Sequence, residues 1–543
     1  MRKYYIGYLM PIVFLTIGIT GCTNLDERVY SEVSESNFRA NDESLASLIA
    51  SVYHPLTYIM DWQGLFDAQE ESGDVVITPI RPNGWDDGGT YRRMHQHTWN
   101  SESWQTENCY DTPYSAINNA NRILDQIENG EFKLSDSQKS STIADLRAIR
   151  AVWYMMLLDT HGNVPLVTHF NDSVPKQATR KEVFNFVVSE LKAAIPALSE
   201  TVDASTYGSL TKWGALTALA RVYLNGEVYT GTAYWKECLN CCNQIINSGK
   251  FSLSTDYKSI FAYDNGSSNK EIIFAVPYDS RYQGFQMQHK WFPPIAKYVF
   301  GNSSDYFWGG SCANPQFIKS YEEGDKRLED TWLIGPQYYT TGSNAGKLAW
   351  MCKNYLPSLT CMKNGINYTS IDYGYRIWKY GSDPSTTNGK WNNDFPFFRY
   401  AEVLLDKAEC LLRLGQNEDE AAQIVTQLRQ RDFDDESKAT VTVAELKGDT
   451  RIKYGTLDWD NNIDVAGDQT PVTLGGLYDE WGWEFACEAQ RRTEMIRFGT
   501  YSKKNWFNHT AVTDGHTAIF PIPLSALETN GNLKQNPGYD SNR

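Results

Sequence analysis

A helical hairpin over residues 400–431 is the feature that most constrains the fold of this chain. Its first half carries apolar residues at spacings of three and four, which places them on one helix face: Ala401, Leu404, Leu405, Ala408, Leu411 and Leu412. Gly415 is suited to end this helix because glycine readily adopts positive φ, and Asn417 is suited to cap the next helix. A helix pair of this tetratricopeptide type cannot bury its apolar face alone, so other helices must cover it.

Further segments with the same helical period supply those partners. Together with the hairpin they predict scaffold helices over about 111–127, 141–159, 183–198, 212–249, 400–431 and 477–498. Long irregular stretches separate them, above all 60–110 and 280–395. The 543 residues contain no Pro/Ser-rich linker and no low-complexity tract that would divide the chain. The sequence therefore predicts one mainly α domain over 22–543, a tetratricopeptide-like scaffold of helix pairs with long irregular loops.

The N-terminus has the pattern of a bacterial lipoprotein signal. Arg2 and Lys3 precede an apolar run over 6–19, and small residues then lead to Cys22. The alternative, a transmembrane helix, fits less well because the run is short and interrupted by a proline. We therefore predict a signal peptide over 1–21, lipidation of Cys22, and attachment to a membrane surface through that anchor.

The net charge and the absence of known catalytic motifs argue against several classes of function. The formal net charge is −16, and removal of Arg2 and Lys3 with the signal, which holds no acidic residue, takes it to −18. Nucleic-acid phosphates need a basic surface, so we expect no nucleic-acid partner. The sequence has no G-x-S-x-G, H-E-x-x-H, Walker or dinucleotide-binding glycine motif. Its many carboxylates leave a lipid-anchored hydrolase as one alternative, but we expect a non-catalytic protein that needs no cofactor.

Nine cysteines follow the predicted lipidation site, an odd number, so at least one cannot pair within the chain. Cys238, Cys241 and Cys242 suggest a metal site, but they fall in one predicted helix with no histidine nearby, and free cysteine packs well in cores. We interpret them as core residues and predict no metal site. Cys352 and Cys361 lie in an irregular stretch and could form a disulfide in an oxidising compartment.

Aromatic residues outside the helices point to a sugar ligand. Phe, Trp and Tyr make up 13% of the chain, and many lie in the two long loop regions beside Asp, Asn and Arg. Flat rings stack on the apolar faces of sugar rings, and the polar side chains can pair with hydroxyl groups. The alternative is that each ring only fixes a loop on the scaffold. We expect several of the rings to form one binding surface.

Several short motifs occur in a fixed order along the chain. They lie at residues 114–121, 147–151, 159–166, 211–224, 398–409, 484–499, 520–523 and 535–539, after a Leu-Asp pair that follows the signal. In this order they resemble the SusD/RagB family of nutrient-binding outer-membrane lipoproteins of Bacteroidetes. Cys487 and Ala489 depart from the commonest pattern of the 484–499 motif. The matched motifs specify the scaffold rather than the ligand.

The resemblance implies a lipid-anchored protein on the cell surface, at the outer membrane. It would capture an oligosaccharide and deliver it to a partner SusC-like TonB-dependent transporter, acting as the lid of that transporter. Some members bind peptides, and this alternative stays open. The resemblance also places ligand residues in the variable loops, which gives nine candidates: Asp74, Arg81, Trp85, Trp99, Asn100, Trp291, Tyr306, Trp308 and Arg376. Trp104 and Tyr114 lie close to a motif helix, and we assign them to packing.

Overall fold

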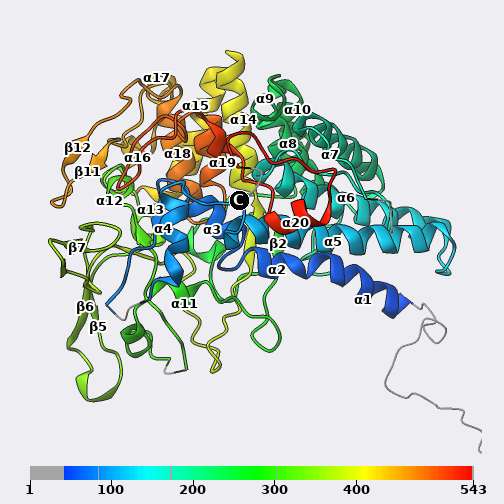
Figure 1. The fold of residues 1–543 in the computed structure, drawn as a ribbon. Coiled ribbons are helices and arrows are strands. Elements are labelled where there is room, and N and C mark those ends of the chain that lie inside the picture. Colours follow the sequence, from blue (N-terminus) through cyan, green and yellow to red (C-terminus); the bar gives the residue numbers. More distant parts are fainter. Residues whose placement is uncertain (1–41, 83–84, 171–173, 303, 541–543) are drawn as a thin grey trace, which may run out of the picture.

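The computed structural model describes residues 42–82, 85–170, 174–302 and 304–540 (Figure 1). The predicted signal peptide and Cys22 lie outside these residues, so the structure does not bear on them. Within the described ranges, no helix combines the length and the apolar character that a membrane crossing requires.

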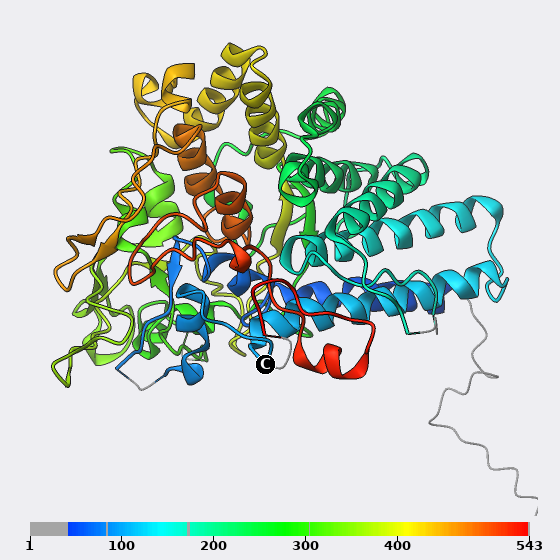
Figure 2. The same ribbon diagram turned by 45° about the horizontal axis from the view of Figure 1, so that its top comes forward.

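A stack of helices forms the scaffold. It contains α5 (Trp104–Glu128), α6 (Asp136–Thr160), α7 (Arg180–Ala194), α8 (Lys212–Leu224), α10 (Trp235–Asn247), α14 (Tyr400–Leu414) and α15 (Glu418–Asp432). Each of these helices packs on the next one in this order. Figure 2 shows α5 to α10 on the right and the loops and hairpins of residues 300–390 on the left. The predicted mainly α, tetratricopeptide-like class is confirmed.

Local sequence sets where these helices begin and end. Capping boxes start two of them, with Ser135 and Gln138 at α6 and with Thr179 and Glu182 at α7. Gly415 ends α14 in the left-handed conformation, as predicted. Asn417 does occupy the position before α15, but it has positive φ and its side chain makes no capping hydrogen bond, so its predicted capping role is wrong.

Every predicted scaffold segment contains a helix, and the bounds differ notably in two of them. Helix α5 begins at Trp104 rather than near residue 111, because the apolar period continues backward through buried Cys109 and Tyr110. The segment predicted over 477–498 is broken into α18 (Gly475–Phe485) and α19 (Arg491–Arg497). Between them Cys487 and Ala489 have positive φ, which interrupts the helix.

The remaining elements are short. The other helices are α1 (Asp42–Tyr53), α2 (Pro55–Ile59), α3 (Leu65–Glu70), α4 (Thr90–His95), α9 (Gly226–Thr230), α11 (Gln288–Trp291), α12 (Pro315–Ile318), α13 (Arg327–Thr331), α16 (Glu436–Ala439), α17 (Val443–Leu446) and α20 (Leu524–Thr529). The described residues form six antiparallel strand pairs, of which three join distant segments and three are local hairpins. They are β1 (Val76–Ile77) with β3 (Cys312–Ala313), β2 (Ile272–Val276) with β10 (Phe395–Arg399), β4 (Trp332–Leu333) with β9 (Arg376–Ile377), β5 (Gly335–Tyr338) with β6 (Leu348–Cys352), β7 (Met362–Lys363) with β8 (Ile366–Asn367), and β11 (Thr456–Leu457) with β12 (Ile463–Val465).

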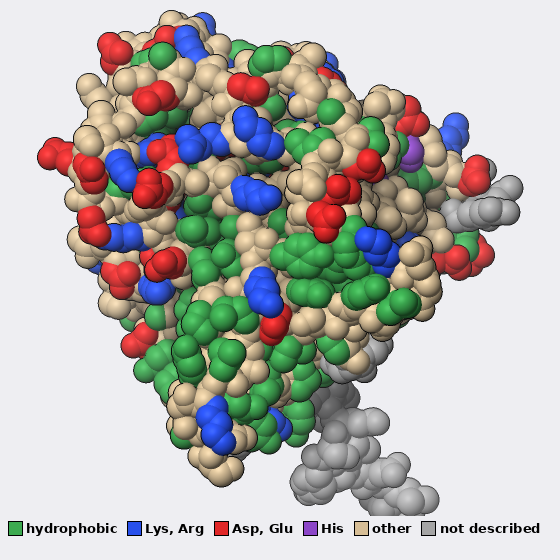
Figure 3. All heavy atoms as spheres, turned by 90° about the vertical axis from the view of Figure 1, so that its left-hand side faces the viewer, with side chains coloured by type: hydrophobic (Ala, Val, Ile, Leu, Met, Phe, Trp, Pro, Cys, Tyr) green, Lys and Arg blue, Asp and Glu red, His purple; other side chains and the backbone are tan. Residues whose placement is uncertain are grey.

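One face of the molecule carries much exposed apolar surface (Figure 3). It is the face formed by the hairpins β5–β6, β7–β8 and β11–β12. Exposed apolar side chains in or beside these strands are Tyr338, Leu348, Met362, Ile366, Tyr368, Ile463 and Val465. All nine cysteines of the described chain are buried free thiols, so Cys352 and Cys361 form no disulfide in this structure.

A network of buried ion pairs lies where β10, α13, α15 and α18 meet. The Glu484 carboxylate accepts from Arg399 at 2.6 Å, from Arg431 at 2.7 Å and from Arg327 at 3.3 Å. All four side chains are almost fully buried. Burial alone would raise the pKa of Glu484, but the three guanidinium groups outweigh it and lower the pKa. Glu484 therefore stays ionised and joins four elements.

We expect Glu484→Gln to lower the free energy of unfolding by about 3–5 kcal/mol, because it leaves buried guanidinium groups without their shared carboxylate. Urea unfolding of the chain without residues 1–22 measures this. Since folding lowers the pKa of Glu484, its stabilisation is complete above the ordinary value of 4.5 and is lost as the pH falls below it. The variant should lack this acid-dependent loss.

The matched control is Glu323→Gln. Glu323 also faces a cation, Lys438 at 3.8 Å, but its side chain is almost fully exposed, so we expect no measurable change in stability. A loss for Glu484→Gln that is no larger than for the control would show that the buried network does not stabilise the fold.

Candidate functional site

Three tryptophans from separate loops come together to form an aromatic platform. They are Trp62, between α2 and α3, Trp85, before α4, and Trp308, between α11 and β3. Trp308 stacks on Trp85 with ring centroids 6.5 Å apart and planes inclined by 22°. Trp62 meets Trp308 edge-on at 5.2 Å. All three side chains are partly exposed, so the rings are held in place and still accessible from outside.

The backbone beneath the platform fixes the position of Trp85. A Cβ atom on Gly310 would lie 2.2 Å from the Trp85 ring, so the ring rests directly on this glycine and no larger residue fits there. Arg81 donates from Nε to the Gly310 carbonyl at 2.8 Å and from Nη1 to the Tyr373 carbonyl at 3.0 Å. Arg81 is itself buried. It therefore holds the loop that supports the platform.

A buried charge cluster supports the other side of Trp85. The Trp85 ring stacks on the Tyr91 ring, with centroids 5.6 Å apart, and the Lys290 ammonium lies 3.9 Å from the Tyr91 ring centroid. Lys290 pairs with Asp67 and, at 2.7 Å, with Glu71. Burial would lower the pKa of Lys290, but the two carboxylates outweigh it and raise the pKa. A charged lysine is thus fixed below the platform, where it favours a rigid aromatic stack.

Tyr306 lies two residues from Trp308 and is 68% exposed. A Cβ atom on Gly389 would lie 3.4 Å from the Tyr306 ring, so the ring packs beside this glycine. His289 contacts both parts of this region, since its ring lies 5.7 Å from Trp308 and its Nε2 bonds the Gly389 carbonyl at 2.7 Å. Tyr306 therefore extends the exposed aromatic surface beyond the platform. Its role as a ligand residue stays a prediction.

The structure corrects the expectation that Trp99 and Trp291 face a ligand. Trp99 is 5% exposed and donates from Nε1 to the Tyr539 hydroxyl at 2.8 Å, so the C-terminal segment covers it. Trp291 is 1% exposed and packs against Phe285 at 5.7 Å and Tyr380 at 5.5 Å. Both rings fix loops on the scaffold.

The structure also corrects the expectation that the charged residues Asp74 and Arg376 face a ligand. Asp74 is fully buried, with its carboxylate bonded to Arg491 at 2.7 Å and to the Tyr454 hydroxyl at 2.7 Å. Arg376 is fully buried and donates to backbone carbonyls, including that of Tyr373 at 2.8 Å. Burial, then the nearby Arg81, lowers the pKa of Arg376 to about 10. Like Arg81, both residues stabilise loops and lie too deep to meet a ligand in this structure.

Three further predictions have mixed outcomes. Asn100 is exposed, but its side chain accepts from the Glu102 backbone N–H at 3.1 Å just before α5, and none of its contacts brings it to the platform. Tyr114 donates to the Pro165 carbonyl at 2.7 Å, which confirms its packing role. Trp104 is 44% exposed, so its assignment to packing is wrong. Trp104 is the first residue of α5, and burial begins with the next residue, Gln105.

Trp62 is the platform residue that sequence reasoning did not select. It lies in the same early loop region as Trp85, and its aromatic character is the only signal that could have identified it. The sequence does not show that it meets Trp308, which lies 246 positions later.

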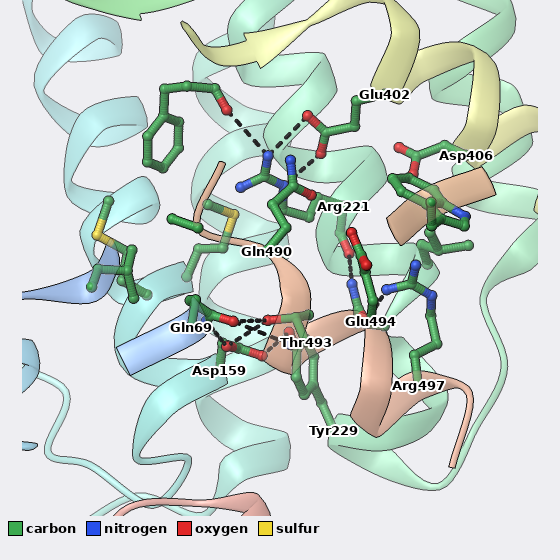
Figure 4. Close-up of a pocket in the computed structure, with 18 residues that line it drawn as sticks. Gln69, Asp159, Arg221, Tyr229, Glu402, Asp406, Gln490, Thr493, Glu494 and Arg497 are labelled. Atoms are coloured by element: carbon green, nitrogen blue, oxygen red, sulfur yellow. Dashed lines mark hydrogen bonds and ion pairs between the residues drawn. The ribbon is translucent and has the colours of Figure 1, made fainter. Parts of the chain in front are cut away.

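A separate internal cavity lies between the helix stack and α19 (Figure 4). Residues that line it form ion pairs, such as Arg221 with Glu402 at 2.6 Å and Arg497 with Glu409 at 2.8 Å. It offers about 40 Å³ to the centres of water molecules, which is room for a few waters and too little for a sugar ring. The exposed platform is therefore the better ligand surface.

The chain matches two family models and is similar to several known proteins. The model described as "SusD family" matches residues 249–539, and one described as "Starch-binding associating with outer membrane" matches residues 24–224. Starch-binding protein SusD of Bacteroides thetaiotaomicron is 24% identical over 500 residues, covering 84% of this chain and 82% of that protein. A SusD-like protein of Formosa agariphila is 26% identical over 561 residues, covering 98% and 99%.

Solved structures share the fold. Bacteroides fragilis NanU matches with a TM-score of 0.70 and 21% identity, covering 94% of this chain and 99% of that one. Surface glycan-binding protein A of Bacteroides thetaiotaomicron, solved in complex with laminarihexaose, matches with a TM-score of 0.66 and 19% identity, covering 92% and 100%. Since the first family model alone covers more than half of the sequence, the chain belongs to the SusD family.

Proposed function

We propose that this chain is a non-catalytic surface lipoprotein that binds an oligosaccharide on the platform of Trp62, Trp85 and Trp308. The observation that carries the proposal is the platform itself, three partly exposed tryptophan rings brought together from distant loops. The relatives support the ligand class, since one is named as starch-binding and another was solved with laminarihexaose.

The ring geometry suits a glycan better than an extended peptide. Trp85 and Trp308 are inclined by only 22°, so their ring planes are nearly parallel, while the ring of Trp62 stands at 68° to that of Trp308. Flat rings stack on the apolar C–H faces of consecutive sugar units, and this needs no backbone pairing by the protein. The nearby Tyr306 supplies a further ring and a hydroxyl group that can pair with sugar hydroxyls.

We further propose that the protein is anchored at the outer membrane through lipidated Cys22 and hands its ligand to a SusC-like TonB-dependent transporter, acting as a lid. The signal pattern before Cys22 supports the anchor. Family membership and the description "associating with outer membrane" support the location. The transporter itself is inferred from the family resemblance.

Binding should be lost when the platform is truncated. We expect Trp85→Ala and Trp308→Ala each to weaken binding of the recognised oligosaccharide by about tenfold or more, equivalent to about 1.4 kcal/mol, because central aromatic anchors dominate such surfaces. Isothermal titration of the chain without residues 1–22 against polysaccharides and oligosaccharides measures this. Trp104→Ala is the matched control, an exposed tryptophan outside the platform, and it should bind normally.

Other outcomes of the titration would change the proposal. Saturable binding that survives both platform substitutions would place the glycan site elsewhere. Binding of basic or neutral peptides with no response to any sugar would favour the peptide alternative. Release of shortened product from a glycan by the pure protein would show that it is a hydrolase.

Buried and platform tryptophans should differ in their effect on stability. We expect Trp291→Ala to lower the free energy of unfolding by about 3–5 kcal/mol, because it empties a fully packed core position. Trp308→Ala should cost less than half as much, since its ring is partly exposed. Urea unfolding curves compare the two variants. Equal losses would mean that Trp308 serves packing as much as Trp291 does.

The anchor is tested by Cys22→Ser. We expect the wild-type protein to sediment with membranes, to incorporate labelled fatty acid, and to co-purify with a TonB-dependent transporter after mild detergent extraction. The variant should lose the label and the membrane association. A variant that stays lipidated would show that another residue carries the anchor.

A further inference from the structure

Four candidate metal ligands face one another between α10 and α14. Cys238 and Cys242 are four residues apart on α10, and Asp406 and Cys410 are four residues apart on α14. Residues at this spacing lie on the same face of a helix. The two helices pack directly against each other, and all four side chains are buried. Two such pairs on facing helices form a compact set of donors.

Their distances suit a small cation. The Cys238 and Cys242 sulfurs are 4.0 Å apart. These two sulfurs and one carboxylate oxygen of Asp406 all lie within 4.8 Å of one another. The thiol of Cys410 contacts that of Cys238. Tetrahedral zinc with Zn–S bonds of about 2.3 Å places its sulfur ligands about 3.8 Å apart. The donors therefore need to move only slightly to bind such an ion.

Asp406 provides a second and independent observation. Its Oδ2 atom is buried and has no hydrogen-bond partner among the described residues. The nearest arginines are committed to other carboxylates, Arg221 to Glu402 at 2.6 Å and Arg497 to Glu409 at 2.8 Å. Figure 4 shows Arg221 turned toward Glu402, with Asp406 beside that pair. A buried carboxylate without a cation is costly, and burial raises its pKa.

We propose that Cys238, Cys242 and Asp406 bind a divalent cation of the zinc type, with Cys410 as the adjacent fourth donor. Thiolate and carboxylate ligands in a tetrahedral arrangement favour zinc over magnesium or calcium, which prefer oxygen ligands alone. Binding by the three residues releases two thiol protons and one carboxylic proton and leaves the site with one net negative charge.

The site would join two distant parts of the chain. Helices α10 and α14 are separated by more than 150 residues, a region that contains the Trp308 loop of the platform. A metal bound between the two helices would clamp the ends of that region. The sequence predicted no metal site because the three cysteines share one helix, no histidine lies nearby, and free cysteine packs well in cores. The missing ligands come from α14, which only the fold places beside them.

Titration with metal tests the inference. The full-length protein, purified in detergent, reduced and freed of metal by a chelator, is titrated with Co²⁺ and then with Zn²⁺. We expect one ion per chain, the absorption of a tetrahedral cobalt–thiolate complex, its displacement by Zn²⁺, and a higher melting temperature with metal. Cys238→Ser, Cys242→Ser and Asp406→Asn should each weaken binding by about 100-fold or more, because each removes a ligand.

Cys241→Ser is the matched control, since Cys241 is buried on the same helix but lies outside the donor group. It should keep the cobalt spectrum and the metal-dependent rise in melting temperature. If a ligand variant does not fold, Cys410→Ser provides a milder test, and a shift in its cobalt spectrum would support the proposal. The proposal is wrong if the reduced protein binds no stoichiometric metal, if the ligand variants bind as tightly as the control, or if mass spectrometry shows a native disulfide among these cysteines.

Discussion

The structure depends on a network of buried ion pairs around Glu484. Taking an ion out of water costs several kcal/mol, and the cost is recovered only where opposite charges meet with good hydrogen-bond geometry. Glu484 meets this condition with three arginines at 2.6–3.3 Å. Each of those arginines comes from a different element, β10, α15 or α13. The network therefore specifies how these elements are placed relative to one another, and a displaced element would leave buried charges unpaired.

The same principle explains why the fold could be predicted from sequence. The motifs at 211–224, 398–409 and 484–499 contain the two halves of buried ion pairs: Arg221 with Glu402 at 2.6 Å, and Glu409 with Arg497 at 2.8 Å. The motif at 159–166 contains Asp159, which pairs with Arg492 at 3.0 Å. These charges stand at fixed positions in the sequence because the fold requires them to meet. Together with the helical period of the scaffold segments, they made the family and the fold class recognisable.

The aromatic platform was predicted less well, and the tryptophans show why. Trp85 and Trp308 belong to the platform, whereas Trp99 and Trp291 are buried, yet all four lie beside polar residues in the two long stretches, 60–110 and 280–395, that separate the predicted scaffold helices. What separates them is cover from distant segments. Tyr539 covers Trp99 from 440 positions away, and no local pattern reports such a contact. The same limitation hid the position of Trp62 and the proximity of Asp406 to the cysteines of α10, since their neighbours also come from other parts of the chain.

The segment around α3 connects the scaffold to the platform. Glu70 accepts from the backbone N–H groups of Cys487 and Gln490 at 3.2 and 3.3 Å, so α3 is bonded to the irregular turn before α19. Its neighbour Glu71 pairs with Lys290, which lies under Tyr91 and thus under Trp85. Adjacent carboxylates therefore hold the scaffold on one side and the aromatic rings on the other. Because a ring that is already fixed loses little conformational freedom on binding, this connection favours a preorganised surface for a flat ligand. The acidic residues of 70–74 are accounted for by contacts within the protein, since Asp74 in turn pairs with Arg491.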